Sequence, residues 1–434
     1  MTISPWILLL LSVPVILLGE FLVRRIKTLS YFNIPVPVVG GLVVALIVLL
    51  INIFGHDQVQ FLTSVKERWW TWLVTPEIEW FNGPSKEVQL PFLVGFFTCI
   101  GLNASCKLVQ RGGMHVIILL VLATILAVLQ NILGILMAKA MHLSPLMGIV
   151  CGGLTLTGGP GTALGFAPTL VEAGLADAAV LGIAAATFGI FVSSLLGGPV
   201  GSRLIRSRNL KPHADQSAVI EPTPSKRASL VGDAVALASF GKKFLVHLLI
   251  LLLCIKLGAW LSFFMVKAHL KFPIYMGAMI VGVILRNVLD ASGSRWLDSK
   301  IISLMDSVLL AVFISMAMMS LNLSRLAGAA LPMTVILLAQ VVLMILFARY
   351  ITFPLMGRDY DAAVMTSGHI GFGLGITPNA VANMKSLVES FGPSQRAFLV
   401  VPIVGAFLID FTNALNINTF INWLGPAIPF TKHL

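Results

Sequence analysis

Long apolar runs recur along the whole chain and predict helices that span a membrane. Most runs are about 20 residues long, the length that a helix needs to cross the hydrocarbon core of a bilayer. The predicted spans are 5–23, 35–54, 90–106, 114–138, 178–202, 244–266, 272–290, 301–322, 330–353 and 397–424. Five spans precede the middle of the chain and five follow it. The pattern therefore predicts an all-α polytopic membrane protein.

Two further apolar segments, 144–170 and 361–386, are crowded with glycine, proline, threonine and serine. Non-helical backbone at membrane depth persists only where protein or a water-filled cavity satisfies its polar groups. Glycine suits such a break because it adopts backbone conformations that are closed to other residues. We therefore predict that each segment is a re-entrant hairpin with a helix break at a polar cavity. The alternative interpretation is that these glycines only allow helices to pack closely.

The composition excludes the soluble classes of protein. The 434 residues are 57% hydrophobic and 11% charged, with a mean hydropathy of +0.95, whereas soluble chains carry roughly a quarter charged residues. Soluble enzymes and nucleic-acid-binding domains are thereby excluded, and the net charge of +11 is attributed to membrane topology. The four cysteines lack the spacing of metal ligands, so they predict neither a disulfide framework nor a metal site.

Positive charge is distributed unevenly if both hairpins return to the side from which they enter. The basic segment 203–243 is the candidate linker between two domains, and we predict that it is cytoplasmic. Of the 29 Lys and Arg residues, 20 then lie on the linker side and eight on the other side, as the positive-inside rule requires. This topology places both termini outside. The Trp-rich segment 55–89 becomes an external loop at the membrane interface.

The two halves of the chain share short motifs in the same order. Gln130 precedes Gly158 by 28 residues, and Gln340 precedes Gly368 by 28 residues. Five crossings in each half would make the second copy an inverted one. Inverted repeats with interrupted helices are typical of secondary transporters. The predicted repeats, divided by the linker, are 1–202 and 244–434.

Several longer motifs cover most of the chain. In the first half they are Ile34-Pro35-x-Pro37-Val38-x-Gly40-Gly41, Gly101-Leu102-Asn103-Ala104, Gln130-Asn131, Thr157-Gly158-Gly159-x-Gly161-Thr162, Ala186-Thr187-Phe188-Gly189 and Gly197-Gly198-Pro199-Val200. In the second half they are Tyr360-Asp361-Ala362-Ala363-Val364, Gly368-His369-x-Gly371-Phe372-Gly373-Leu374-Gly375, Phe391-Gly392-Pro393-Ser394 and Val401-Pro402-x-Val404-Gly405-Ala406-Phe407. Together these motifs resemble the bacterial sodium/glutamate symporters, the glutamate:sodium symporter family.

The resemblance implies a fold of two inverted-topology repeats of five transmembrane helices, each with one re-entrant hairpin. It also implies Na⁺-coupled symport of L-glutamate or a closely similar small dicarboxylate across the lipid bilayer of a bacterial inner membrane. Sodium would be the coupling ion, with no other cofactor and no enzymatic activity. The family further implies a homodimer in which the domain that carries the hairpins moves as an elevator.

One position departs from the pattern of the family. The first hairpin of the family usually has His between its second and third glycines, whereas this chain has Pro160. Proline donates no N–H group and fixes φ at about −65°. Pro160 is therefore a candidate for specificity, and a related dicarboxylate or amino acid is the alternative substrate.

The candidate substrate-binding residues lie in the two hairpins, where no Asp, Glu, Lys or Arg occurs from 140 to 171 or from 362 to 384. Backbone N–H groups freed at the N-termini of half-helices attract anions. Hydroxyl and amide side chains would add hydrogen bonds to carboxylates, with Na⁺ offsetting their charge. The candidates are Thr157, Gly158, Gly159, Gly161, Thr162, Ser367, Gly368, His369, Gly371, Phe372, Gly373, Thr377 and Asn379.

Asp410 is the only charged residue from 397 to 431 and is the first candidate for the sodium site. A buried carboxylate is costly unless it is paired or binds a cation, and hard cations prefer oxygen ligands. A buried ion pair, for example with Lys256, is the structural alternative. The other candidate sodium ligands are amide side chains: Asn413, Asn103, Gln130 and Gln340. These amides would otherwise only join helices by hydrogen bonds.

Other functions remain as alternatives at this stage. A cation/proton antiporter on a similar inverted-repeat fold would exchange ions at Asp410 and at His369, the only ionisable group from 362 to 384. Antiporters usually carry more than one carboxylate near the break, which disfavours this alternative. An intramembrane enzyme is disfavoured because the hairpins contain no nucleophile–base pair and no metal-ligand spacing. A passive channel also uses re-entrant loops, and counterflow would distinguish it from a carrier.

Overall fold

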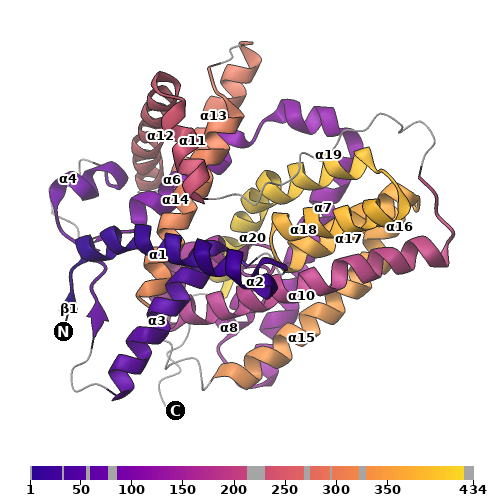
Figure 1. Ribbon diagram of the computed structural model, residues 1–434, viewed down its shortest axis with the longest axis horizontal. Coiled ribbons are helices and arrows are strands. Elements are labelled where there is room, and N and C mark those ends of the chain that lie inside the picture. The colour runs from indigo at the N-terminus through magenta and orange to yellow at the C-terminus, as the bar shows by residue number, and fades with distance from the viewer. Residues whose placement is uncertain are drawn as a thin grey trace. The chain divides into compact units, whose positions relative to one another are not determined.

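Helices form at all ten predicted spans (Figure 1). The structure, a computed structural model, describes residues 2–31, 34–54, 59–76, 86–212, 230–267, 274–293, 296–321 and 329–424. Eight described helices are long and apolar enough to cross a membrane: Pro5–Arg25, Val36–Phe54, Gly113–Ala140, Ala178–Ser207, Lys242–Met265, Ser299–Met319, Ala330–Leu355 and Gln395–Leu424. A ninth, Leu90–Asn103, is apolar but shorter, with 14 residues. The prediction of an all-α polytopic membrane protein is confirmed.

The chain forms two compact units. Unit 1 comprises 1–30, 35–107 and 226–324, and unit 2 comprises 31–34, 108–225 and 325–434. Each unit therefore combines a part of the first half of the chain with a part of the second half. The predicted repeats 1–202 and 244–434 rest on the order of motifs along the sequence. The division into two spatial units does not test them, so they stay a prediction.

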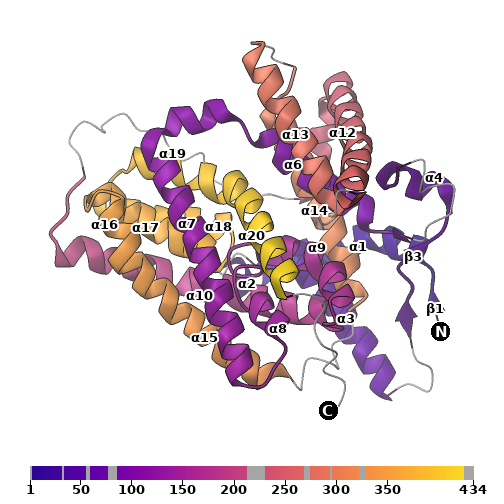
Figure 2. The same ribbon diagram turned by 180° about the vertical axis from the view of Figure 1, so that it is seen from behind.

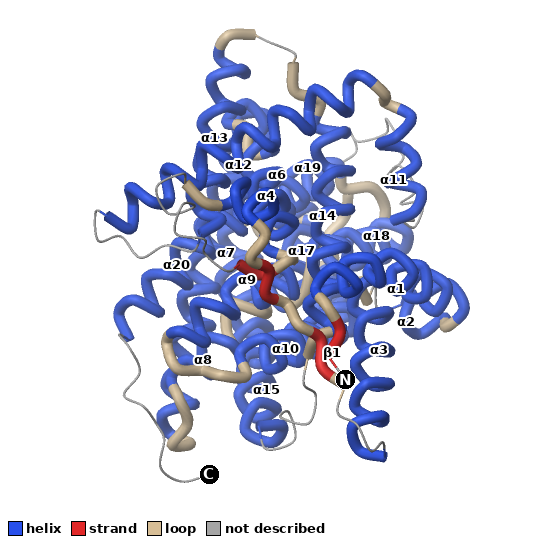
Figure 3. Tube along the Cα trace, turned by 90° about the vertical axis from the view of Figure 1, so that its left-hand side faces the viewer, coloured by secondary structure: helices blue, strands red, loops and turns tan. Residues whose placement is uncertain are grey.

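Unit 1 contains six helices of 14 residues or more and a short strand region. Its long helices are α1 (Pro5–Arg25), α3 (Val36–Phe54), α6 (Leu90–Asn103), α12 (Lys242–Lys267), α13 (Ile274–Ala291) and α14 (Ser299–Met319). Its shorter elements are α11 (Leu230–Ser239), α4 (Arg68–Thr71), η1 (Trp72–Val74) and the strands β1 (Thr2–Ile3), β2 (Gln60–Phe61), β3 (Ser64–Val65) and β4 (Lys86–Glu87). β1 pairs with β2 in parallel, and β3 pairs with β4 antiparallel. Figure 3 shows strands as short red pieces beside the N-terminus.

Small residues let the helices of unit 1 approach one another closely. A Cβ added to Gly40 on α3 would lie 2.1 Å from the Val15 carbonyl oxygen on α1. A Cβ added to Gly101 on α6 would lie 2.2 Å from the Met279 carbonyl oxygen on α13. Larger side chains would force these backbones apart, so glycine at these positions permits the tight helix contacts that membrane proteins use.

The predicted external loop 55–89 is described at 59–76 and 86–89, and its other residues lie outside the described chain. The α12 residue Lys256 joins this loop, because its ammonium group donates to the Trp72 and Thr75 carbonyl oxygens, at 2.8 Å each. The same group lies 4.3 Å from the centroid of the Trp72 ring. The Lys256 charge is thus stabilised within unit 1 by two hydrogen bonds and a cation–π contact.

Unit 2 contains both glycine-rich segments. Its elements are α7 (Cys106–Ala140, shared at its start with unit 1), α8 (Pro145–Val150), α9 (Gly159–Glu172), α10 (Ala178–Ser207), α15 (Ala330–Phe347), the π-helix η3 (Ala348–Thr352), α16 (Phe353–Leu355), α17 (Tyr360–Leu374), α18 (Thr377–Phe391), α19 (Gln395–Ile403), the π-helix η4 (Val404–Leu408) and α20 (Ile409–Leu424). α7 runs beside α20 (Figure 2), where the Thr124 and Thr412 hydroxyls are 2.9 Å apart.

The predicted linker 203–243 is partly helical. α10 continues through its first residues to Ser207, and α11 and the start of α12 occupy its last part. Its middle, 213–229, lies outside the described residues.

Candidate functional site

The first glycine-rich segment contains a helix break. α8 is followed by a series of turns, and α9 begins at Gly159, whose φ is 69°. Both backbone polar groups of Gly153, within these turns, are hydrogen-bonded to side chains. Its N–H donates to the Asn131 side-chain oxygen at 2.9 Å, and its carbonyl oxygen accepts from the Asn413 amide at 2.8 Å. Side chains of α7 and α20 therefore satisfy buried non-helical backbone that would otherwise be costly.

The second glycine-rich segment breaks between Leu374, where α17 ends, and Thr377, where α18 begins. The Thr377 hydroxyl donates to the Gly405 carbonyl oxygen in η4 at 2.6 Å. The Asn379 amide donates to the Ile190 carbonyl oxygen on α10 at 2.8 Å. Here the residues of the break bind the backbone of neighbouring helices. α17 and α18 lie side by side in Figure 1.

The two breaks meet inside unit 2. A Cβ added to Gly159 would lie 3.1 Å from the Ile376 side chain and 3.9 Å from the Gly375 carbonyl oxygen. Gly159 is the first residue of α9, and Ile376 is the N-cap of α18. Two helix N-termini therefore converge, and each carries a partial positive charge. The Gly159 N–H donates to the Thr155 carbonyl oxygen at 2.9 Å, and Pro160 and Pro378 have no N–H.

Gln130 on α7 joins the two breaks. Its side-chain oxygen accepts from the Thr157 hydroxyl at 2.7 Å, and its side-chain nitrogen donates to the Gly373 carbonyl oxygen at 2.8 Å. The matching glutamine, Gln340 on α15, donates to the backbone carbonyl oxygen of Gln130 at 2.7 Å. Both polar atoms of the Gln130 side chain are thus engaged, whereas the Gln340 oxygen is buried without a partner among the described residues.

His369 lies fully buried on α17. Its Nδ1 atom is 2.9 Å from the Thr352 hydroxyl in η3, and its ring packs against Phe372, with centroids 5.0 Å apart. Its Nε2 atom has no hydrogen-bond partner among the described residues. The His369 contact that the structure shows therefore joins α17 to a π-helix, and π-helical turns are frequent at functional sites.

Asp410 lies in the first turn of α20, directly after η4. It is partly exposed in the isolated chain, and no described side chain pairs with it. Asn413, three residues on, is fully buried and contacts the first break through its amide nitrogen. Asp410 therefore lies about one helical turn before Asn413, whose amide contacts the first break.

Buried amide atoms without partners gather in unit 2. Three of them are oxygens, which are hard ligands of the kind that alkali cations accept. Among the described residues, Gln340 Oε1, Asn379 Oδ1, Asn413 Oδ1 and Asn131 Nδ2 are buried and have no hydrogen-bond partner. Buried polar groups are rarely left unpaired, so these atoms are candidates for binding an ion or a substrate. No group of three His, Cys, Asp or Glu side chains suited to another metal occurs in the described chain.

Three predicted residues have other contacts. The Ser367 hydroxyl donates to the Gly197 carbonyl oxygen at 2.8 Å, which joins α17 to α10. A Cβ added to Gly371 would lie 2.3 Å from the Ala380 Cα atom, so this glycine allows α17 and α18 to pack closely. Asn103 belongs to unit 1, where its amide donates to the Ser303 hydroxyl at 3.4 Å.

The remaining predicted residues of the hairpins line the breaks. Pro160 occupies the first turn of α9, where proline is favoured because the N–H that it lacks would have no helical partner. Gly158 lies in the last turn of the first break, where an added Cβ would lie 2.5 Å from the Leu154 carbonyl oxygen. Gly161, Thr162 and Gly368 are buried in α9 and α17.

The sequence patterns missed two partners of the site. Thr352 lies in η3, and the nearby Pro354 is a signal for it, because a proline ring clashes with a carbonyl in the preceding turn and favours such a distortion. Ser193 on α10 accepts from the Asn379 amide at 2.8 Å. No motif marks Ser193, since its role arises only when α10 packs on α18.

Comparisons with known proteins agree with one another. The model of the family described as sodium/glutamate symporter matches residues 2–76 and 77–393. The sodium/glutamate symporter of Escherichia coli K12 is 36% identical over 407 residues, which cover 94% of each chain. That of Haemophilus influenzae Rd is 36% identical over 423 residues, which cover 95% of this chain and 96% of the relative.

A likeness to a solved structure is much weaker. The sodium proton antiporter MjNhaP1 from Methanocaldococcus jannaschii at pH 8 aligns over 97% of both chains, with 14% identity and a TM-score of 0.40. A likeness at this level assigns neither fold nor function.

Proposed function

The chain belongs to the sodium/glutamate symporter family, and on that premise we propose that it takes up L-glutamate, or a closely similar small dicarboxylate, together with Na⁺. It is a multi-pass membrane transporter and not an enzyme. Sodium is the coupling ion, with no further cofactor. The names of relatives that match nearly the whole chain support this pair of substrates.

The observation that carries the substrate site is the convergence of two helix N-termini at Gly159 and Ile376. Both ends bring partial positive charge to one place, together with the N–H groups of Gly161 and Thr377 in their first turns, and no Asp, Glu, Lys or Arg occurs from 140 to 171 or from 362 to 384. A dicarboxylate would bind between the breaks through these N–H groups. The Thr162 hydroxyl on α9 would complete its hydrogen bonds. Thr377 and Asn379 would instead fix the shape of the second break, because their donors are bound to Gly405, Ile190 and Ser193.

Sodium would bind at the unpaired amide oxygens. Gln340, Asn379 and Asn413 each bury such an oxygen in unit 2, and Asp410 on α20 would supply a negative charge. Gln130 is proposed to position the breaks and not to bind the ion, because both its polar side-chain atoms already have partners. Asn103 also buries an unpaired side-chain oxygen, but it belongs to unit 1 and its role as a sodium ligand stays a prediction.

The two breaks are proposed to be the tips of re-entrant hairpins in a pair of inverted repeats. In chain order, the first half supplies three long helices to unit 1 and then α7 to α10 to unit 2. The second half supplies α12, α13 and α14 to unit 1 and then α15 to α20 to unit 2. This matching order supports a duplication. Unit 2 holds both breaks, so it would be the part that moves as an elevator.

The setting of the protein is proposed from the same premise. The chain would lie in a bacterial inner membrane as a homodimer, with both termini outside and segment 203–243 in the cytoplasm. The excess of Lys and Arg on the linker side supports this orientation.

Uptake of radiolabelled L-glutamate into proteoliposomes tests the proposal. We expect uptake with an inward Na⁺ gradient, none with a matched K⁺ gradient, competition only by close analogues, and counterflow of preloaded substrate. Uptake of a different competitor without uptake of glutamate would reassign the substrate. Na⁺/H⁺ exchange without uptake of any acid would replace the symporter by the antiporter.

The variant Asp410→Asn tests the ion site within the same assay. Loss of the carboxylate is expected to raise the Na⁺ concentration for half-maximal uptake by about tenfold, which corresponds to about 1.4 kcal/mol. An unchanged Na⁺ activation curve would remove Asp410 from the site.

A further inference from the structure

The helix that carries the chain from unit 1 to unit 2 follows one interruption and contains another. Unit 1 ends at Lys107 and unit 2 continues from Leu108, within α7. One interruption, which we call the α6–α7 junction, lies at Ala104 and Ser105. The other interruption lies within α7 at Gly113, where the backbone is non-helical. The two interruptions therefore bracket a boundary between the units.

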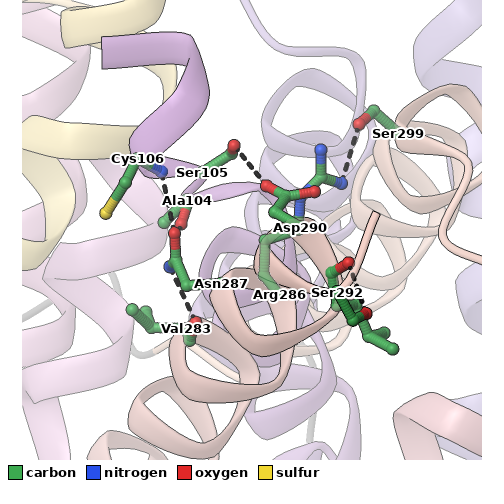
Figure 4. Close-up of polar contacts among 10 residues, drawn as sticks. Ala104, Ser105, Cys106, Val283, Arg286, Asn287, Asp290, Ser292 and Ser299 are labelled. Carbon is green, nitrogen blue, oxygen red and sulfur yellow. Dashed lines mark hydrogen bonds and ion pairs between the residues drawn. The ribbon is translucent and has the colours of Figure 1, made fainter. Parts of the chain in front are cut away.

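The α6–α7 junction is held by side-chain hydrogen bonds within unit 1 (Figure 4). The Asn287 side-chain oxygen accepts from the Cys106 N–H at 2.8 Å, and the Asn287 side-chain nitrogen donates to the Ala104 carbonyl oxygen at 2.9 Å. One side chain of α13 thus caps the end of α6 and the start of α7 together. Such capping replaces the backbone partners that both helix ends lack.

A charged group reinforces the same contact. The Ser105 hydroxyl donates to the Asp290 carboxylate, which also accepts from Arg286 Nε at 3.0 Å. Arg286 in turn donates to the Ser299 hydroxyl at 3.1 Å. These side chains come from α13 and from the start of α14 (Figure 4). We call Asn287, Asp290 and Arg286 the α13 clamp.

Gly113 differs from the tightly packed glycines of unit 1. Its φ of 63° and ψ of −156° lie in a region that is open essentially to glycine alone. No heavy atom among the described residues lies within 4 Å of a Cβ added there. Glycine is therefore required at this position by the backbone conformation and not by close packing.

We propose that Gly113 is the joint about which unit 2 moves during transport, with the α13 clamp as its fixed base. The inference rests on the proposed function, because alternating access requires one part of a carrier to move. Hinges are a few residues that absorb large changes of φ and ψ. Gly113 has the freedom to do so. The α13 clamp holds the α6–α7 junction to unit 1, so the change of conformation is confined to the residues around Gly113.

The first test compares Gly113→Ala with a matched glycine variant. Gly241, between α11 and α12 in unit 1, also has a positive φ, of 51°, and no described heavy atom within 4 Å of an added Cβ. Gly241→Ala therefore adds the same methyl group away from this boundary. We expect Gly113→Ala to lower the rate of Na⁺-driven glutamate uptake about tenfold, and Gly241→Ala to leave it within about twofold of the parent rate.

Binding is measured on the same purified variants, as the thermal stabilisation that glutamate produces in the presence of Na⁺. Gly113→Ala is expected to keep this stabilisation, because the added methyl group meets no neighbour and the site lies elsewhere in unit 2. A parental uptake rate in Gly113→Ala would overturn the joint. Loss of the stabilisation would overturn it as well, by showing that Gly113 is needed for the binding site itself.

A second measurement does not depend on the substrate. Spin labels at Trp296→Cys in unit 1 and Leu331→Cys in unit 2 replace exposed side chains, and Cys106→Ser removes the exposed native thiol. Pulsed electron paramagnetic resonance is expected to show a broad or divided distribution of distances, which Gly113→Ala narrows and Gly241→Ala does not. The same distribution in all three chains would overturn the joint. If the parent protein takes up no glutamate, the proposed function is contradicted. The measured distances still show whether Gly113 is the joint.

Discussion

In the first break the backbone is held by side chains that come from α7 and α20, whereas in the second break Thr377 and Asn379 reach out to the backbone of neighbouring helices. Asn131 accepts from the Gly153 N–H and Asn413 donates to the Gly153 carbonyl oxygen, so the peptide groups on both sides of this residue are bound. Thr377 and Asn379 instead bind the carbonyls of Gly405 and Ile190. The first break is therefore held mainly by side chains of its host helices. The second also receives the Gln130 bond at Gly373, but it adds bonds from its own side chains to neighbouring backbones.

This difference predicts where substitutions have their effect. The first break should be most sensitive to changes far from it in sequence, because its glycines contribute only backbone atoms. The second break should respond to changes within it, and conservative replacements there should restore function.

The largest effect is expected for Asn413→Leu. The variant leaves the buried Gly153 carbonyl without its donor and removes an amide oxygen proposed to bind Na⁺. An unpaired buried polar group costs about 1–3 kcal/mol, so Na⁺-driven uptake should fall by up to about 100-fold. Asn422→Leu on the same helix is the control, since it makes the same replacement at an exposed side chain. Uptake by Asn413→Leu close to the parent rate would show that the first break does not depend on this side chain of α20.

The two glutamines separate positioning from ion binding. Gln130→Met removes the bridge between the breaks and should raise the glutamate concentration for half-maximal uptake about tenfold, or about 1.4 kcal/mol. The ratio of activation by Li⁺ to activation by Na⁺ should not change. Gln340→Met removes an unpaired oxygen and should change that ratio. An altered ion preference in Gln130→Met would contradict its positioning role.

A smaller effect is expected for Thr377→Val, which keeps the shape of the side chain and removes the hydroxyl that donates to Gly405. The loss of one hydrogen bond, worth about 1 kcal/mol, should slow uptake about fivefold. Thr377→Ser keeps the hydroxyl and should restore most of the rate. Equal rates in the two variants would show that the second break does not depend on this contact.

Pro160 should have the smallest effect on the rate of uptake. It starts α9 at a position where its missing N–H costs nothing, so Pro160→Ala should change uptake by less than about twofold. Pro160→His should shift the order of competing substrates toward glutamate if the tip reads the substrate. An unaltered competition profile in Pro160→His would leave Pro160 with a backbone role alone.

Much of the fold was predictable because long apolar runs leave few alternatives. Helices form at every predicted span, and both glycine-rich segments contain a break. The end of α6 at Asn103, before the predicted end of its span, was not predictable. It depends on Asn287, which lies more than 180 residues along the chain from Ala104.

The site was only partly predictable, because equal spacing does not imply equal partners. Gln130 and Gln340 occupy matching places in the sequence, yet one bridges the breaks and the other keeps an unpaired oxygen. Asn103 has the same chemistry but belongs to the other unit. Partners such as Ser193 depend on which helices pack together, and no local pattern records that.

The exposure of Cys106 at the start of α7 gives the molecule a chemical handle of its own. Its three other cysteines are buried, so a bulky maleimide dye should label one position per chain without any substitution. That position adjoins the α13 clamp, since the Cys106 N–H is bound to Asn287. The fluorescence of an attached dye would then report, in the native sequence and in real time, how the surroundings of this junction change as the carrier turns over.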